Sequence, residues 1–217
     1  MNTFFRMART IWNVRTRFCT TVLFIALVAG FAGGAQAQRD SSDDERMIND
    51  PRVQHRDYQF PGTNETIPYA LFVPEGYDSA EPAPLIVSLH GLGRSHDWLM
   101  GYEGFLDQAQ AGGYIVVTPL GYIRRGWYGS RPLQDNPDSA ERSEQDVMNV
   151  MQRVRDEFNI DDNRIYLWGH SMGGAGTYHI AIKNPDLFAG IAAVAAAPRQ
   201  DGIPGGLISC RAGGRTA

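Results

Sequence analysis

Short runs of apolar, β-branched residues recur along the chain and predict the strands of a buried sheet. Residues 85–89 (Leu-Ile-Val-Ser-Leu) and 114–117 (Tyr-Ile-Val-Val) are apolar at nearly every position. This is the pattern of a strand that is covered on both faces in a parallel sheet. Residues 164–168 and 190–195 repeat it, so four core strands are predicted.

The stretches between these strands have the length or the periodicity of helices. Residues 98–111 leave room for one helix, and residues 172–183 predict another that ends at Asn184-Pro185. Between residues 144 and 159 one helical face is apolar, through Val147, Val150, Met151, Val154 and Phe158. This alternation predicts an α/β fold of the doubly wound type, with a mostly parallel sheet and right-handed crossovers.

An antiparallel hairpin is predicted before the parallel strands. Apolar and polar residues alternate on both sides of a turn at residues 62–64, as in two paired strands, with the apolar set Tyr58, Phe60, Ile67, Tyr69, Leu71 and Val73. Residues 38–56 are polar without any apolar period and predict a linker. The folded domain is therefore expected to span residues 57–198.

The first 37 residues have the composition of an export signal. Four arginines and no acidic residue accompany an apolar run at 21–29, and small residues end in Ala35-Gln36-Ala37. This layout is typical of a secretory signal peptide, so a secreted or periplasmic protein is predicted, in contact with a membrane only through this signal. An uncleaved anchor is the main alternative, because the uncharged stretch 18–38 approaches the ~20 residues that cross a bilayer. A mitochondrial transit peptide ranks third.

Charge and cysteine content narrow the classes of partner. The 217-residue chain has a net charge of −4, and without residues 1–37 it keeps 16 Lys and Arg against 24 Asp and Glu, a net charge of −8. Such an acidic chain offers no basic surface to nucleic acid. Because Cys19 lies in the signal segment, Cys210 has no intrachain partner after cleavage.

The clearest chemical motif is Gly169-His170-Ser171-Met172-Gly173. It fits the G-x-S-x-G nucleophile elbow and lies between a predicted strand and a predicted helix, as that motif requires. Gly169 and Gly173 are expected because side chains there would collide with neighbouring backbone. Ser171 is therefore the predicted nucleophile, supported by its neighbour His170, at a helix N-terminus that favours developing negative charge.

A second motif, His90-Gly91-Leu92-Gly93, directly follows the first buried strand. In hydrolases with a nucleophile elbow, the loop at this place supplies one oxyanion donor. The backbone N–H groups of Leu92 and Met172 are therefore the predicted oxyanion hole, and His90 and Gly91 are expected to orient the loop. On its own the motif would be an ordinary glycine turn after a strand.

Together these pieces resemble the α/β-hydrolase superfamily, and within it the exported esterases of the polyhydroxyalkanoate depolymerase and feruloyl esterase type and similar predicted peptidases. The resemblance rests on residues 85–91, Asp146-Val147, residues 161–166 and residues 169–174. It implies acyl transfer through a serine acyl-enzyme on a small-molecule or polymeric ester, without metal or cofactor. A peptidase of the same fold and a non-catalytic exported binding protein remain open alternatives.

The chain departs from this family after the nucleophile. An acid and then a histidine should follow Ser171, but the one later histidine, His179, lies ~12 Å along the same predicted helix. His96 precedes the serine and would reverse the chain order. Residues 199–217 hold five glycines and no period, and we interpret them as an irregular tail, truncated or out of frame, in place of the last strands. Little activity and an open sheet edge are therefore expected.

Residues 121–141 are long for a plain connection and include several aromatic side chains. They follow the second buried strand, so they should lie at the carboxyl edge of the sheet, where open α/β folds bind ligands. Trp127 and Tyr128 are therefore predicted to line the substrate pocket. The alternative is a surface excursion whose aromatic side chains cover the core.

Overall fold

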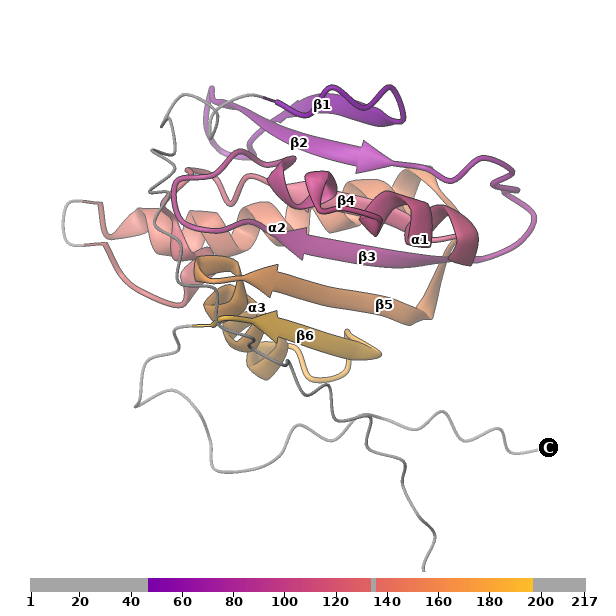
Figure 1. Cartoon of the computed structure of the whole chain (residues 1–217). Coiled ribbons are helices and arrows are strands. Elements are labelled where there is room, and N and C mark those ends of the chain that lie inside the picture. The colour runs from indigo at the N-terminus through magenta and orange to yellow at the C-terminus, as the bar shows by residue number, and fades with distance from the viewer. Residues whose placement is uncertain (1–46, 134–135, 197–217) are drawn as a thin grey trace, which may run out of the picture. The chain divides into compact units, whose positions relative to one another are not determined.

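The computed structural model describes residues 47–133 and 136–196, which build a six-stranded mixed sheet with helices on both faces (Figure 1). The strand order is β1-β2-β4-β3-β5-β6. The α/β fold predicted from the alternating pattern is confirmed. The predicted signal segment at 1–37, the tail at 199–217 and Cys210 lie outside the described residues.

Four parallel strands form the centre and one edge of the sheet. They are β3 (Ala83–Leu89), β4 (Ile115–Pro119), β5 (Ile160–His170) and β6 (Gly190–Val194). β3 pairs in parallel with both β4 and β5, and β5 pairs in parallel with β6. Every residue of β4 is buried, which explains why its sequence lacks the alternation of a half-exposed strand. All four predicted strands are confirmed.

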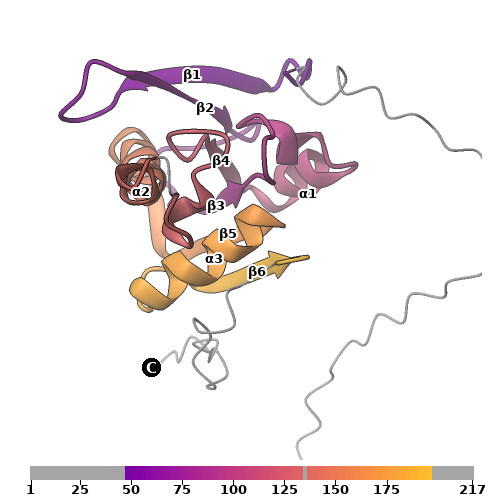
Figure 2. The same cartoon turned by 90° about the vertical axis from the view of Figure 1, so that its left-hand side faces the viewer.

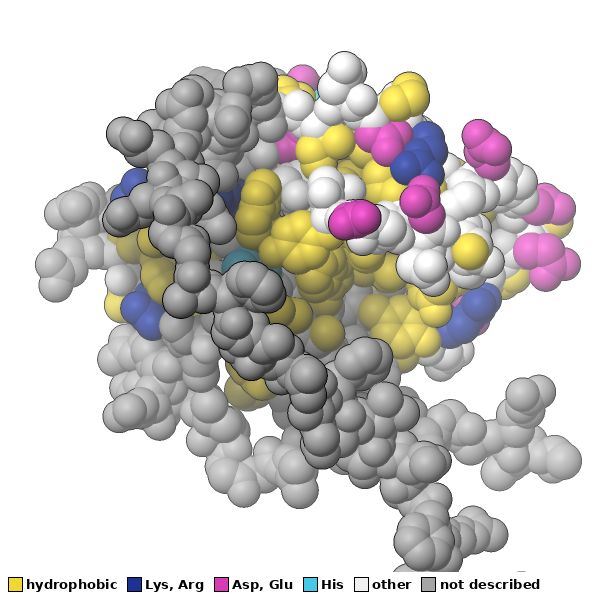
Figure 3. All heavy atoms as spheres, in the orientation of Figure 1, with side chains coloured by type: hydrophobic (Ala, Val, Ile, Leu, Met, Phe, Trp, Pro, Cys, Tyr) yellow, Lys and Arg dark blue, Asp and Glu magenta, His cyan; other side chains and the backbone are white. Residues whose placement is uncertain are grey.

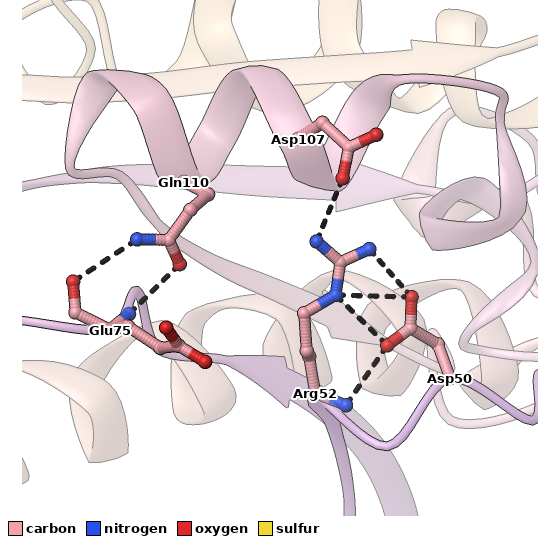
Figure 4. Close-up of polar contacts among 5 residues, drawn as sticks. All are labelled: Asp50, Arg52, Glu75, Asp107 and Gln110. Carbon is pink, nitrogen blue, oxygen red and sulfur yellow. Dashed lines mark hydrogen bonds and ion pairs between the residues drawn. The ribbon is translucent and has the colours of Figure 1, made fainter.

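The N-terminal hairpin consists of β1 (Val53–Gln59) and β2 (Thr66–Phe72), and β2 continues the sheet antiparallel to β4. β1 begins inside the segment predicted as linker, so that boundary is corrected. The alternation is hard to read there because only Val53 and Tyr58 of β1 are buried while the other five positions are polar. Arg52, just before β1, forms ion pairs with Asp50 and with Asp107, which lies on the helix α1 (Phe105–Gly112) (Figure 4).

The helices cover the two faces of the sheet unequally. Figure 2 shows α2 (Asp138–Glu157) and α3 (Met172–Lys183) on one face and α1 (Phe105–Gly112) on the other. The helix predicted at 98–111 is divided into a 3-10 turn, η1 (Trp98–Gly101), and α1, because Gly104 takes a left-handed φ of 74° between them. α2 begins earlier than predicted, at Asp138.

The alternation of side chains along the strands builds one core on each face. Leu85, Val87 and Leu89 of β3 join Ile115 and Val117 of β4 in the core beneath α2 and α3. The residues between them, Ile86 and Val116, belong to the smaller core beneath α1. Because β3, β4 and β5 are parallel and paired in register, their carboxyl ends lie side by side. The segments that follow these three strands therefore come together at the same end of the sheet.

β6 is the last strand of the sheet in the described part of the chain, and none of its residues is fully buried. An apolar hollow of about 420 Å³ lies on the α1 face, lined by Phe105, Tyr166, Trp168 and Ile191 among others. In the view of Figure 3, apolar side chains gather in the middle of this face. A second hollow of about 480 Å³ lies between α3 and β6. Within the described residues no further strand pairs with β6.

Candidate active site

Ser171 occupies the sharp turn between β5 and α3. Its backbone has φ 56° and ψ −110°, a left-handed conformation that costs a residue with a side chain on the order of 1–3 kcal/mol. The turn is held from both sides, since Ser171 N donates to Val194 O at 2.8 Å and Ser171 O accepts from Ala175 N at 3.1 Å. The side chain is half-buried. The strained strand-to-helix turn predicted from the motif is therefore present.

The two glycines of the motif are required by close backbone contacts. A Cβ atom on Gly173 would lie 1.9 Å from Leu89 O, and one on Gly169 would lie 2.4 Å from Gly173 O. Both distances are far below the ~3.5 Å at which non-bonded atoms pack. The glycines thus let the first turn of α3 approach the end of β3, which brings Ser171 to the loop that follows β3.

That loop begins with His90, whose side chain is completely buried. Its Nε2 lies 2.8 Å from Leu120 O and its Nδ1 lies 2.7 Å from Gly91 O. Burial lowers the pKa of His90, so the ring is neutral near pH 7. A neutral imidazole carries one N–H, so it donates to only one of these carbonyl groups. Both ring nitrogens of His90 therefore face backbone carbonyl oxygens, one in its own loop and one in the segment after β4.

The two predicted oxyanion donors lie on the segments that the glycines bring together. Met172 is the first residue of α3, and an N–H group at this position has no partner inside its helix. In the turn after β3, Gly93 N donates to Arg124 O and Arg94 N donates to Gly91 O. Leu92 N has no backbone acceptor among the described residues, and the Leu92 side chain is 46% exposed.

Aromatic side chains pack beside the elbow on the η1 side. The ring of His170 lies 5.5 Å from Trp98 and 6.2 Å from Tyr102 between ring centroids. Trp168, two residues earlier on β5, contacts Tyr102 and donates from Nε1 to Ser88 Oγ at 2.5 Å. A Cβ on Gly91 would be 3.7 Å from His170 Nδ1. The supporting residues His170 and Gly91 therefore lie next to each other.

The two aromatic residues predicted to line the substrate pocket, Trp127 and Tyr128, differ in burial. Trp127 and Tyr128 lie in the short turn η2 (Trp127–Gly129), with left-handed φ values of 57° and 52°. Tyr128 is completely buried and contacts the His90 ring at 5.6 Å between centroids. Its Cβ lies against Gly176 of α3. Tyr128 is thus a core residue beneath the site, which was the alternative reading, whereas Trp127 is half-buried and carries Arg131 at 4.0 Å over its ring.

His179 and His96 contact residues other than Ser171. His179 Nε2 lies 2.8 Å from Glu144 Oε2, and Lys183 binds the same carboxylate, so His179 links α3 to α2. The His96 ring contacts His55 of the edge strand β1 at 5.9 Å between centroids, and its buried Nε2 has no hydrogen-bond partner among the described residues. No side-chain hydrogen bond joins an imidazole to Ser171 among the described residues, which include all five histidines.

Two residues that support the site, Asp146 and Ser143, were not predicted as site residues from the sequence. Asp146 of α2 is completely buried and accepts hydrogen bonds from Gly121 N and Tyr122 N. Ser143, one turn earlier, accepts from Tyr128 N at 3.0 Å. Buried polar residues within an amphipathic helix were the available clue, because α2 buries Ser139, Ser143 and Asp146 along with its apolar stripe.

The described residues show neither a cluster of metal ligands nor a helix that could span a membrane. No three His, Cys, Asp or Glu side chains there come together as ligands for a metal ion. None of the helices described is both long and apolar enough to cross a bilayer.

A strained serine between a parallel strand and a helix, crowded by two glycines against the loop of the neighbouring strand, defines the nucleophile elbow of an α/β-hydrolase. Residues 61–202 match the family described as "Putative esterase". The chain therefore belongs to this esterase family. The resemblance to α/β-hydrolase esterases inferred from the motifs is confirmed.

Individual relatives support the same family. Feruloyl esterase C of Emericella nidulans is 28% identical over 155 residues, covering 67% of this chain and 49% of that protein. The bifunctional acetylxylan esterase/xylanase of Neocallimastix patriciarum is 31% identical over 100 residues, covering 46% of this chain and 14% of that protein. The chain spans about half, or less, of the length of these curated relatives.

Solved structures share the fold. The fluorophosphonate-binding serine hydrolase F of Staphylococcus aureus superposes with a TM-score of 0.56 at 20% identity, covering 66% of this chain and 56% of that chain. At this level of identity the likeness concerns the fold alone.

Proposed function

We propose that this protein is a serine hydrolase of carboxylic esters in which Ser171 is the nucleophile. The observation that carries the proposal is the left-handed Ser171 backbone at the elbow, held by Val194 O and crowded by Gly169 and Gly173. A strained conformation of this cost persists only where the surrounding structure imposes it, and such strain is concentrated at functional sites.

In the proposed reaction, Ser171 Oγ attacks the ester carbonyl carbon and the carbonyl oxygen becomes an oxyanion. The N–H groups of Leu92 and Met172 donate to that oxygen, and the alcohol leaves as the acyl-enzyme forms. Water then releases the carboxylic acid. The Ser171 proton needs a general base, and no imidazole in the described part of the chain binds Ser171. Turnover by this chain is therefore expected to be slow, with ~10³- to 10⁴-fold acceleration over water.

The substrate is proposed to be an ester of a small molecule or polymer. Support comes from the family and from relatives named as feruloyl and acetylxylan esterases. The half-buried Trp127 with Arg131 stacked on it is the proposed pocket wall. Export to the periplasm or the medium is proposed from the composition of residues 1–37.

Covalent labelling tests the nucleophile directly. The purified protein is incubated with a fluorophosphonate probe and digested, and the modified residue is located by mass spectrometry. Ser171 should carry the label, and Ser171→Ala should remove it together with hydrolysis of a p-nitrophenyl ester. Ser79→Ala, which alters an exposed serine outside the elbow, should behave as the parent protein. Equal ester hydrolysis by the Ser171→Ala variant and the parent would refute the assignment, and binding without labelling would favour the non-catalytic alternative.

A further inference from the structure

The buried carboxylate of Asp146 accepts hydrogen bonds from three donors on two separate segments of the chain. Its Oδ1 accepts from Tyr58 OH at 2.5 Å, and its Oδ2 accepts from Gly121 N at 2.7 Å and Tyr122 N at 3.0 Å. The side chain is completely buried. Burial raises the pKa of Asp146 against the opposing effect of these hydrogen bonds. No cation is paired with it in the described residues, so backbone N–H groups replace water around this carboxylate.

The two N–H groups that Oδ2 holds begin a strained segment. Tyr122 has a left-handed φ of 63°, and the same segment returns to left-handed values at Trp127 and Tyr128. Backbone in this state is retained only where surrounding contacts impose it. Asp146 supplies the contacts at the start of the segment, and Ser143, on the same helix, supplies one at Tyr128 N.

The same segment contacts the loop after β3 through two further polar contacts. Leu120 O lies 2.8 Å from His90 Nε2, and Arg124 O accepts from Gly93 N at 3.0 Å. These contacts fall on either side of Leu92 in the sequence. Residues 120–124 are therefore sandwiched between the Asp146 carboxylate on one side and residues 90–93 on the other.

We propose that Asp146 is a positioning residue that fixes residues 120–124 and, through them, holds the Leu92 N–H in place for the oxyanion. The inference rests on the proposed function for the role of Leu92, but the mechanical coupling from Asp146 to residues 90–93 does not depend on catalysis. Removing the carboxylate leaves Gly121 N and Tyr122 N buried without an acceptor, so residues 120–124 rearrange and release their hold on His90 and Gly93.

Amide hydrogen exchange of the full chain tests the coupling without requiring turnover. Asp146→Ala removes both Oδ2 bonds. Tyr58→Phe is the matched control, because it removes the Oδ1 partner at the same carboxylate and leaves Gly121 and Tyr122 bound. Peptides from β3 and β4 serve as internal references for global stability.

In Asp146→Ala we expect about tenfold faster amide exchange at residues 120–124 and also at residues 91–94, with a smaller change in β3 and β4. In Tyr58→Phe we expect exchange at residues 120–124 and 91–94 to change by at most about twofold. Faster exchange at 120–124 with unchanged 91–94 would overturn the proposal, as would an equal effect of Tyr58→Phe on 91–94. If Asp146→Ala does not fold, Asp146→Asn carries the test: its neutral amide oxygen binds more weakly, so exchange at 91–94 should rise about threefold, and no rise overturns the inference.

The rate of fluorophosphonate labelling at Ser171 gives a second readout. It should fall about tenfold in Asp146→Ala and stay near the parent value in Tyr58→Phe, since displacement of an oxyanion donor slows attack. If the parent protein is not labelled, the proposed function fails while the exchange result still decides the coupling. If labelling is equal in parent and Asp146→Ala although 91–94 exchange faster, the positioning role in catalysis is refuted.

Discussion

Replacing Gly173 by alanine should separate α3 from β3 at the point where the site is built. The added Cβ would lie 1.9 Å from Leu89 O, 2.5 Å from Leu89 C and 2.8 Å from His90 O. Contacts between non-bonded atoms are optimal near ~3.5 Å, so the helix and the strand must move apart by about 1.6 Å. All three contacts are to backbone atoms, so no side chain can rotate away from the new methyl group.

The cost should exceed that of ordinary overpacking. Inserting a methyl group into a packed core costs about 1–3 kcal/mol when side chains can adjust, and here two backbone segments must shift. We expect a loss of about 3 kcal/mol or more from a total stability of ~5–15 kcal/mol. Because the displaced backbone leads into residues 90–93, labelling of Ser171 should also slow by about 10²-fold, the effect of a ~1 Å misplacement.

Urea unfolding followed by tryptophan fluorescence measures the stability change. Gly190→Ala is the matched control, because a Cβ at Gly190 meets nothing closer than 3.4 Å, at a Tyr166 ring carbon. Alanine in that strand should be neutral or slightly stabilising, by about 0.5 kcal/mol. An unchanged unfolding midpoint for Gly173→Ala, or a fall as large in Gly190→Ala, would show that the close approach of α3 to β3 is not what the glycine serves.

Two further changes test the surroundings of the site. Burial lowers the pKa of His96 to about 4 from an ordinary 6.5, so the folded state favours the neutral ring. The folded state therefore keeps its full stability above pH 6.5. It loses up to about 3 kcal/mol as the pH falls from 6.5 to 4, because the unfolded chain then takes up a proton that the folded protein does not. Urea midpoints at pH 7 and pH 5 should therefore differ less in His96→Gln than in the parent, and an identical difference contradicts the reasoning. Trp168→Phe keeps an aromatic ring but deletes the donor to the fully buried Ser88 Oγ, which should cost about 1–3 kcal/mol, partly recovered when Ser88→Ala is added; no recovery in the double variant would mean that the hydrogen bond is not the cause.

Periodicity and one motif were enough to predict the sheet and the strained strand-to-helix turn at Ser171. The apolar runs of β3 to β6 and the stripe of α2 depend on neighbours a few residues away, because burial on both faces of a strand or on one face of a helix leaves a short repeat. The spacing of Gly169, Ser171 and Gly173 likewise depends on one turn of backbone. The start of β1 was missed because its exposed positions are polar and only two of its side chains are buried.

Only the tertiary structure decided how the rest of the site is supported. Asp146 contributes to the family resemblance and lies on an amphipathic helix, but the sequence does not indicate that it binds backbone groups 24 and 25 residues away and Tyr58 88 residues away. Tyr128 reads as a pocket aromatic, yet a left-handed backbone turns it into the core against Gly176. Such contacts join residues that no local period connects. The sequence therefore determined the strands and the turn at Ser171, while the tertiary contacts between distant segments determined what holds that turn and its neighbouring loops in place.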